Sequence, residues 1–160
     1  MARNGLERDW LASTHERLEG AGHRPSAPRS AVIDLLAEQT CCLTAREITD
    51  LLRRGGRDVG AATVYRALEL LHSLGAVQRL DTGERFARYE AAGPRGEHHH
   101  HLLCDRCGRV SPFEDERLER AIADLAERLS YGVEGHDVVL RGTCPACASG
   151  ETGLRRAAWP

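Results

Sequence analysis

The sequence predicts an α+β protein made of two small domains. Apolar residues recur at helical spacing through the first half, which ends in a hairpin pattern, whereas the second half alternates between short strands and a helix. Two Cys-x-x-C pairs in the second half indicate a metal-stabilised fold there. The 160 residues suffice for domains at 1–90 and 97–148, with a hinge at 91–96 ("AAGPRG") and an unstructured tail at 149–160.

Four helices are predicted in the first domain. The segment "LERDWLASTHERLEGAG" places Leu6, Trp10, Leu11 and Leu18 near helical spacing and ends in glycines. The segment "SAPRSAVIDLLAEQ" begins a second helix with Pro28 in its first turn, where a missing N–H has no cost.

The third and fourth helices carry clearer end signals. "LTAREITDLLRRGG" opens with a capping box formed by Thr44 and Glu47 and closes on two glycines. "AATVYRALELLHSLGA" turns Val64, Leu68 and Leu71 inward and stops at a glycine.

A hairpin follows these helices. "AVQRLDTGERFARYE" has the pattern of two strands around a turn at Asp81-Thr82-Gly83-Glu84. Three of these helices followed by a hairpin are typical of a winged helix. In a winged helix, the last helix before the hairpin enters the major groove of DNA. The sequence therefore predicts "AATVYRAL" as a DNA-reading element.

The second domain is predicted to begin with a strand made by the histidine run in "EHHHHLLCDRC". A turn at Cys104–Gly108, a strand near Val110–Phe113, a helix over roughly 115–130 and a strand in "GHDVVLRGTC" follow. We expect this helix to have one buried apolar stripe, formed by Leu118, Ile122, Leu125 and Leu129.

The two cysteine pairs supply four thiolates, which is the ligand set of a tetrahedral structural zinc site. The pairs are Cys104/Cys107 and Cys144/Cys147, with Gly108 and Pro145 favouring tight turns beside them. A redox disulfide is the alternative, but a thioredoxin-like site needs one such pair rather than two.

The four histidines divide between two faces if they form a strand, because successive side chains point to opposite sides. His98 and His100 then share one face, for which His136 and Glu119 are candidate partners in a zinc or other divalent-metal site.

The opposite face carries the other two histidines, His99 and His101, for which Glu90 is the candidate partner. A metal held by these three residues would clamp the two domains together. A solvated loop remains the alternative for the whole histidine run.

Composition excludes some classes of protein. No apolar run approaches the roughly 20 residues of a membrane span, and the charged N-terminus lacks the core of a signal peptide, so we expect a cytoplasmic protein without a membrane partner. The motifs of zinc deaminases and of H-E-x-x-H proteases are absent, so we expect neither an enzyme nor a small-molecule substrate. A zinc-ribbon adaptor would explain the cysteines but not the histidines.

In this order of elements the chain resembles the ferric uptake regulator (Fur) family of metal-dependent bacterial repressors over roughly residues 15–148. The most specific segments are "AATVYRAL", "HHHHLLCDRCGRV" and "GTCPAC". The resemblance implies a homodimer that binds operator DNA, with an N-terminal winged helix-turn-helix domain and a C-terminal α/β dimerisation domain.

The resemblance also assigns roles to residues. It implies structural zinc at the four cysteines and a second metal site at His98, His100, Glu119 and His136. It implies a regulatory site at Glu90, His99 and His101, where Cys42 in "TCCLTAREI" replaces a histidine that many relatives have and Pro112 replaces a frequent carboxylate. A set of sulfur, nitrogen and oxygen ligands favours Zn²⁺ as the sensed metal, as in a zinc uptake regulator. Iron (Fe²⁺) or peroxide sensing is the alternative, as is a buried, non-ligand Cys42.

For DNA, the family match favours contacts from Tyr65 and Arg66 over an ordinary solvated helix face, with Thr63 near phosphate. Arg24 and Arg29 resemble basic positions that relatives place near the minor groove or the backbone. From their position on the wing, Arg85 and Arg88 are also expected to approach phosphates.

Overall fold

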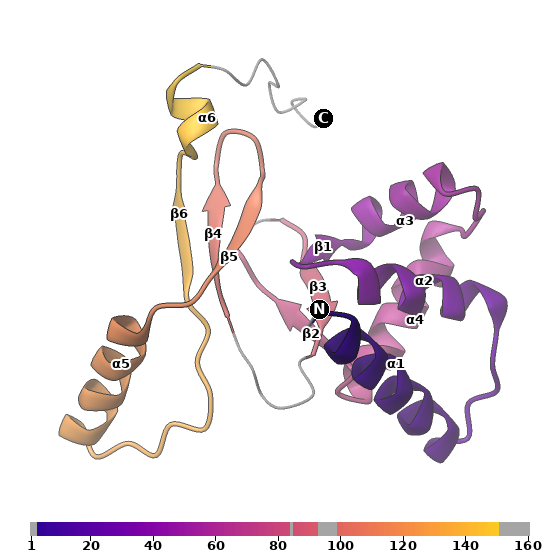
Figure 1. The fold of residues 1–160 in the computed structure, drawn as a ribbon, viewed down its shortest axis with the longest axis horizontal. Helices are drawn as coiled ribbons and strands as arrows, with labels where there is room; N and C mark the ends of the chain where they lie inside the picture. Colours follow the sequence, from indigo (N-terminus) through magenta and orange to yellow (C-terminus); the bar gives the residue numbers. More distant parts are fainter. Residues whose placement is uncertain (1–2, 84, 93–98, 151–160) are drawn as a thin grey trace. The chain divides into compact units, whose positions relative to one another are not determined.

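The structure, a computed structural model, describes residues 3–83, 85–92 and 99–150, with the side chains of residues 3–7 excepted. The chain separates into two compact domains, Met1–His98 and His99–Pro160 (Figure 1). The predicted α+β class is confirmed, since each domain combines helices with a three-stranded sheet. Most of the predicted hinge and tail, residues 93–96 and 151–160, lies outside the described residues. No helix in the described part of the chain could cross a membrane.

The first domain contains four helices and an antiparallel sheet with strand order β1-β3-β2. Its elements are α1 (Arg3–Gly20), α2 (Ala27–Glu38), β1 (Leu43–Thr44), α3 (Ala45–Arg54), α4 (Ala61–Ser73), β2 (Val77–Leu80) and β3 (Arg88–Ala91). All four predicted helices are present. Strand β1 was not predicted, because two residues are too few to show a strand pattern.

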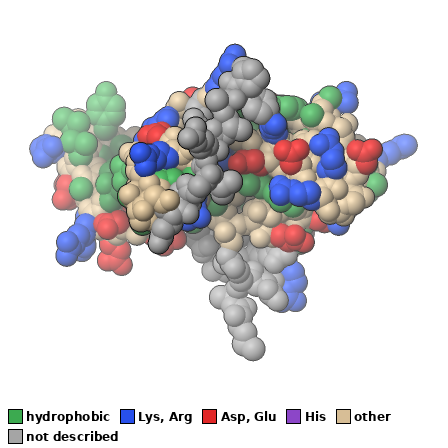
Figure 2. Space-filling view, turned by 90° about the horizontal axis from the view of Figure 1, so that it is seen from above, with side chains coloured by type: hydrophobic (Ala, Val, Ile, Leu, Met, Phe, Trp, Pro, Cys, Tyr) green, Lys and Arg blue, Asp and Glu red, His purple; other side chains and the backbone are tan. Residues whose placement is uncertain are grey.

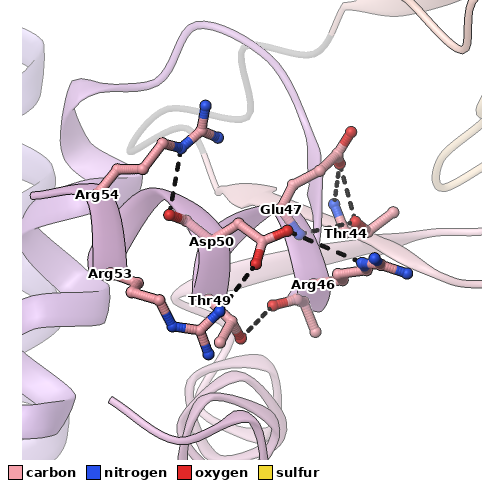
Figure 3. A network of polar contacts seen from close by, with 8 residues as sticks. Thr44, Arg46, Glu47, Thr49, Asp50, Arg53 and Arg54 are labelled. Atoms are coloured by element: carbon pink, nitrogen blue, oxygen red, sulfur yellow. Dashed lines mark hydrogen bonds and ion pairs between the residues drawn. The ribbon is translucent and has the colours of Figure 1, made fainter. Parts of the chain in front are cut away.

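The start of α3 is fixed by the predicted capping box, which Figure 3 shows. The Thr44 backbone N–H donates to Glu47 Oε2 at 2.7 Å, and the Glu47 N–H donates to Thr44 Oγ1 at 3.2 Å. These two bonds satisfy N–H groups that the first turn of a helix leaves without intrahelical acceptors. The polar face of α3 continues with ion pairs from Arg46 and Arg53 to Asp50.

The core of the first domain lies between the helices and the sheet. It includes Val32, Ile33, Leu36, Ile48, Val64, Leu68 and Leu71, each 1% exposed or less. Helix α1 is joined to this core by hydrogen bonds as well as by packing. The Trp10 indole N–H donates to the Ala76 carbonyl at 2.9 Å, and Arg17 Nη1 donates to the carbonyls of Leu74 and Gly75 just after α4.

The predicted four-residue turn of the wing is wrong. Leu80 pairs with Arg88, so the connection between β2 and β3 runs over residues 81–87. Asp81 Oδ1 accepts the Gly83 N–H at 2.9 Å, and Gly83 has a φ of +68°, which a glycine adopts without strain. Glu84 of the predicted turn lies outside the described residues.

The second domain contains a mixed sheet with strand order β5-β4-β6. Its elements are β4 (His100–Cys104), β5 (Val110–Phe113), α5 (Glu116–Arg128), β6 (Val139–Gly142) and α6 (Pro145–Ala148). Strand β4 pairs antiparallel with β5 and parallel with β6. Helix α5 connects the two edge strands, and α6 follows β6 directly (Figure 1).

The predicted burial of the α5 stripe is wrong for the single chain. Leu118 and Ile122 are half-buried, whereas Leu125 and Leu129 are 44% and 59% exposed. The helix is amphipathic, as its spacing predicted. An apolar stripe is buried only where another surface packs against it, and within the described part of the second domain no surface buries Leu125 and Leu129. Figure 2 shows hydrophobic side chains gathered at its left edge, on the part of the second domain that contains α5.

Candidate metal centres and nucleic-acid interface

Four cysteine sulfurs of the second domain converge, as predicted from their spacing. The ligand atoms of Cys104, Cys107, Cys144 and Cys147 all lie within 4.8 Å of one another, and the sulfurs of Cys107 and Cys144 are 3.8 Å apart. None of these cysteines is in a disulfide.

Local backbone geometry brings the two pairs together. Cys104 ends β4 and pairs with Gly142 of the parallel strand β6, so the segment after β6 runs alongside the first pair. Gly108 has a φ of +74° and its N–H donates to the Cys104 carbonyl at 2.8 Å, which closes the first turn. Pro145 begins α6 and sets the direction of the second pair.

The electrostatics of this cluster favour a thiolate at Cys104. The backbone N–H groups of Cys144, at 3.3 Å, and of Cys107 hydrogen-bond the Cys104 sulfur and lower the pKa of its thiol to about 6. Zinc binds thiolates rather than thiols, at about 2.3 Å in tetrahedral sites. Four converging sulfurs with a stabilised thiolate fit such an ion.

A second group joins His100, Glu119 and His136. Glu119 lies between the two imidazoles, with Oε1 at 2.6 Å from His100 Nε2 and Oε2 at 3.1 Å from His136 Nε2. Glu119 is held in the first turn of α5, where Asp115 accepts the N–H groups of Arg117 and Leu118. These three residues belong to a predicted site of four. The fourth residue, His98, lies outside the described residues.

Two details of the histidine prediction were wrong. Strand β4 begins at His100, so His99 precedes the strand, and His136 lies before β6 rather than on it. The predicted alternation still separates the faces: His100 contacts Glu119, whereas His101 is close to His99, with ring centroids 4.8 Å apart. Pro112 pairs with His101 across β4 and β5, so a carboxylate at residue 112 would stand beside that imidazole.

In the first domain, Cys42 and Glu90 are both buried, at 2% and 7% exposed. The ligand atoms of Cys41, Cys42 and Glu90 lie within 4.8 Å of one another. A hydrogen bond with Cys41 and then burial raise the pKa of the Cys42 thiol. The prediction included Cys42 and Glu90 but missed Cys41, although the Cys41-Cys42 doublet is visible in the sequence.

Helix α4 presents the predicted DNA-contacting side chains to solvent. Tyr65 is 45% exposed and Arg66 is exposed, while Thr63 near the helix start is half-buried. Val64 and Leu68 face the core, which leaves Tyr65 and Arg66 on the exposed side of the helix. Arg24 is exposed and its carbonyl accepts a hydrogen bond from Arg29 Nη2, which joins the two basic residues before and within α2.

The two wing arginines differ. Arg85 is exposed in the connection between β2 and β3. Arg88 is 5% exposed, and its Nη1 lies 3.3 Å from Glu47 Oε2. The expectation that Arg88 contacts phosphate is therefore wrong, because the side chain is used inside the domain to join β3 to α3.

The model of the ferric uptake regulator family matches residues 20–141, which reach into both domains and include every candidate ligand described above except Cys144 and Cys147. The chain belongs to the ferric uptake regulator family. The Fur family consists of metal-responsive transcriptional regulators, and the resemblance found in the sequence is thus confirmed.

Relatives within the Fur family are named after different metals. The chain is 35% identical over 133 residues to a ferric uptake regulation protein of Legionella pneumophila, covering 82% of this chain and 96% of the relative. It is also 35% identical over 136 residues to a zinc uptake regulation protein of Mycobacterium tuberculosis, covering 82% of this chain and 100% of the relative.

Solved structures of the family share the fold. The Helicobacter pylori ferric uptake regulator, described with three functional metal-binding sites, has a TM-score of 0.75 at 27% identity and covers 86% of this chain and 93% of its own. A zinc uptake regulator in complex with zinc and DNA has a TM-score of 0.58 at 25% identity and covers 91% of this chain and 97% of its own.

Proposed function

We propose that this protein is a zinc-responsive transcriptional repressor that binds palindromic operator DNA as a homodimer when its regulatory site holds Zn²⁺. The observation that carries the choice of metal is Cys42, a buried sulfur grouped with the Glu90 carboxylate. Thiolate ligands favour zinc, whereas sets of nitrogen and oxygen with five or six positions suit ferrous iron or manganese.

The regulatory site in this proposal consists of Cys42 and Glu90 from the first domain and His99 and His101 from the second. One thiolate, one carboxylate and two imidazoles complete the four positions of tetrahedral zinc. A metal bound by residues of both domains restricts their relative orientation and so shifts the population of conformers toward the DNA-binding one. These four ligands do not include a side chain at residue 112, because Pro112 has no carboxylate to offer.

Two further metal sites complete the proposal. Zinc at Cys104, Cys107, Cys144 and Cys147 is structural, because all four positions of the ion are filled by the protein. The group of His98, His100, Glu119 and His136 holds a second divalent cation in the same domain, and the close contacts of Glu119 with both described histidines support this.

Dimer formation places two reading helices on one palindrome. The exposed apolar side chains of the second domain, among them the paired Leu102 and Leu140, support a homodimer, since exposed apolar surface is a feature of association sites. Helix α4 supplies Tyr65, Arg66 and Thr63 to the major groove, with Arg24, Arg29 and Arg85 nearer the backbone. The zinc uptake regulator structure determined with DNA supports this use of the fold.

An iron-responsive regulator is the second candidate, supported by the ferric name of the Legionella pneumophila relative and by the nitrogen and oxygen ligands of the same site. Titration of operator binding separates the two candidates. The wild type and Cys42→Ser are compared across buffered free Zn²⁺ and, without oxygen, across Fe²⁺, with structural zinc retained. Zinc activation that moves to much higher concentration in Cys42→Ser supports the zinc sensor. Tight ferrous activation with an unchanged zinc response rejects it.

A further inference from the structure

We propose that Cys41 is a second sulfur ligand of the regulatory metal, and that Cys41, Cys42 and Glu90 form a dithiolate half-site within the first domain that binds thiophilic divalent cations such as Zn²⁺ and Cd²⁺. With this second sulfur, one imidazole of the second domain rather than two suffices to complete a tetrahedral ion. The role of this half-site in controlling DNA binding rests on the proposed function. Its ability to bind metal does not.

The sheet of the first domain aligns Cys42 with Glu90. Strands β1 and β3 are antiparallel, with Leu43 opposite Tyr89 and Thr44 opposite Arg88. One further step along this ladder sets Cys42 opposite Glu90, and directly opposed residues of an antiparallel pair share one face. The thiol and the carboxylate are thus brought together by strand register.

Cys41 joins them because the chain is not extended there. Consecutive residues of a strand point to opposite faces, which would separate the two thiols. Between the end of α2 and the start of β1 the chain instead bends at Thr40 and Cys41. The two sulfurs and a Glu90 oxygen consequently lie within 4.8 Å of one another.

This spacing suits a shared metal ion. Tetrahedral zinc with Zn–S distances of about 2.3 Å holds two sulfurs roughly 3.8 Å apart. The four-cysteine cluster of the same chain meets the same 4.8 Å limit, and two of its sulfurs are 3.8 Å apart. The doublet therefore needs only small side-chain adjustments to close on an ion.

Burial adds to the case for a cation. Cys42 and Glu90 are almost fully buried and Cys41 is half-buried. A cation bound there would offset the cost of burying the Glu90 carboxylate and of ionising the two thiols.

The second sulfur changes which metals are preferred. Soft thiolates select zinc and similar ions, whereas ferrous iron and manganese gain less from them. A site with two sulfurs therefore discriminates against iron more strongly than a site with Cys42 alone. Cys41 is in this sense a specificity-determining residue.

The test uses the full-length protein with its structural zinc in place and Co²⁺ as the probe, since thiolate-to-cobalt charge-transfer absorbance grows with the number of sulfur ligands. We expect the absorbance of bound Co²⁺ to fall by about half in Cys41→Ser and in Cys42→Ser and to vanish in the double variant. Thr40→Ser, which changes the same bend without removing a sulfur, should leave it unchanged. Circular dichroism and structural zinc content confirm the fold of each variant.

The outcomes separate the half-site from the proposed function. Unchanged absorbance in Cys41→Ser together with its loss in Cys42→Ser overturns the dithiolate and leaves a zinc sensor with one sulfur. The expected absorbance changes combined with DNA binding that ignores zinc support the half-site and reject the proposed function. The ratio of Zn²⁺ to Fe²⁺ affinity should fall at least tenfold in Cys41→Ser, and a constant ratio contradicts the role in selectivity.

Discussion

Leu102 and Leu140 stand side by side on the parallel strands β4 and β6, and they are 45% and 49% exposed. Leu125 and Leu129 of α5 and Tyr131 just after it are exposed in the same domain. If this surface is the dimer contact, Leu140→Asp should raise the dimer dissociation constant more than tenfold, because each half-exposed leucine contributes about 1–2 kcal/mol on burial. Sedimentation velocity measures this, and Leu140→Met, which keeps the apolar volume, is the control. A dimer of undiminished stability in Leu140→Asp excludes this surface.

Removal of one sulfur from the four-cysteine cluster should release its zinc. We expect Cys104→Ser or Cys144→Ser to lose one tightly held zinc per subunit and to lower the melting temperature, because structural zinc binding is coupled to folding. Elemental analysis and thermal unfolding provide the two readouts. Thr40→Ser, which leaves every sulfur of the chain in place, is the control. A normally folded Cys104→Ser dimer with full zinc content would show that the cluster does not hold zinc.

Arg66→Ala should weaken operator binding at every metal concentration. If Arg66 contacts a guanine, the loss is about 1–3 kcal/mol and is confined to one base position of the operator. If it contacts a phosphate, the loss is uniform across sequences and the salt dependence becomes shallower. Fluorescence anisotropy against operator variants at several salt concentrations distinguishes the two cases. Arg120→Ala on α5 removes the same charge from the second domain, so equal losses in both variants would point to net charge alone.

The hydrogen bond from Trp10 to the Ala76 carbonyl should contribute to the stability of the first domain. Trp10→Phe keeps an aromatic ring but removes one of two donors to the Ala76 carbonyl, which also accepts the Ala92 N–H at 3.0 Å, so the free energy of unfolding should fall by about 0.5–1.5 kcal/mol. Urea unfolding measures the change. Tyr65→Phe, an aromatic change on the exposed face of α4, should have almost no effect. Equal stability of Trp10→Phe and the wild type would mean that the Ala92 N–H alone satisfies the carbonyl.

Tyr89 should make the protein sensitive to alkali. Burial and then the Glu69 carboxylate, 3.3 Å from its hydroxyl, raise the pKa of Tyr89 above its ordinary value of 10.0. The folded state thus favours the neutral phenol, and its contribution is fully present below pH 10 and is lost as the pH rises through the raised pKa. Unfolding measured between pH 8 and pH 11 should show a steeper decline for the wild type than for Tyr89→Phe, with Tyr131→Phe as an exposed control. Parallel curves for the three proteins would contradict this.

Local signals in the sequence predicted most of the helices and both ligand groups of the second domain. Thr44 and Glu47 identified the start of α3, because a capping box is complete within four residues. The two Cys-x-x-C pairs predicted their cluster, because the turns that aim the sulfurs are also local. Features that depend on distant partners were missed or wrong. Strand β1 exists only through its pairing with β3, and the burial of Arg88 depends on Glu47, which is 41 residues away.

The prediction for the apolar stripe of α5 was wrong because burial also depends on a partner. Its spacing predicted an amphipathic helix correctly, but spacing does not say whether the apolar side packs on the same chain or on a second one. Cys41 was missed for a related reason, since only the bend before β1 brings its sulfur to the face of Cys42 and Glu90.

The four-cysteine cluster joins residues that are 40 positions apart, with β5, α5 and β6 lying between them. A zinc ion can be held there only when the fold brings the two pairs together, so its binding free energy would add directly to the stability of the folded domain. Removal of zinc should therefore destabilise the whole segment between Cys104 and Cys144 at once, including the exposed Leu125 of α5, Leu129 at the end of that helix and Leu140 of β6.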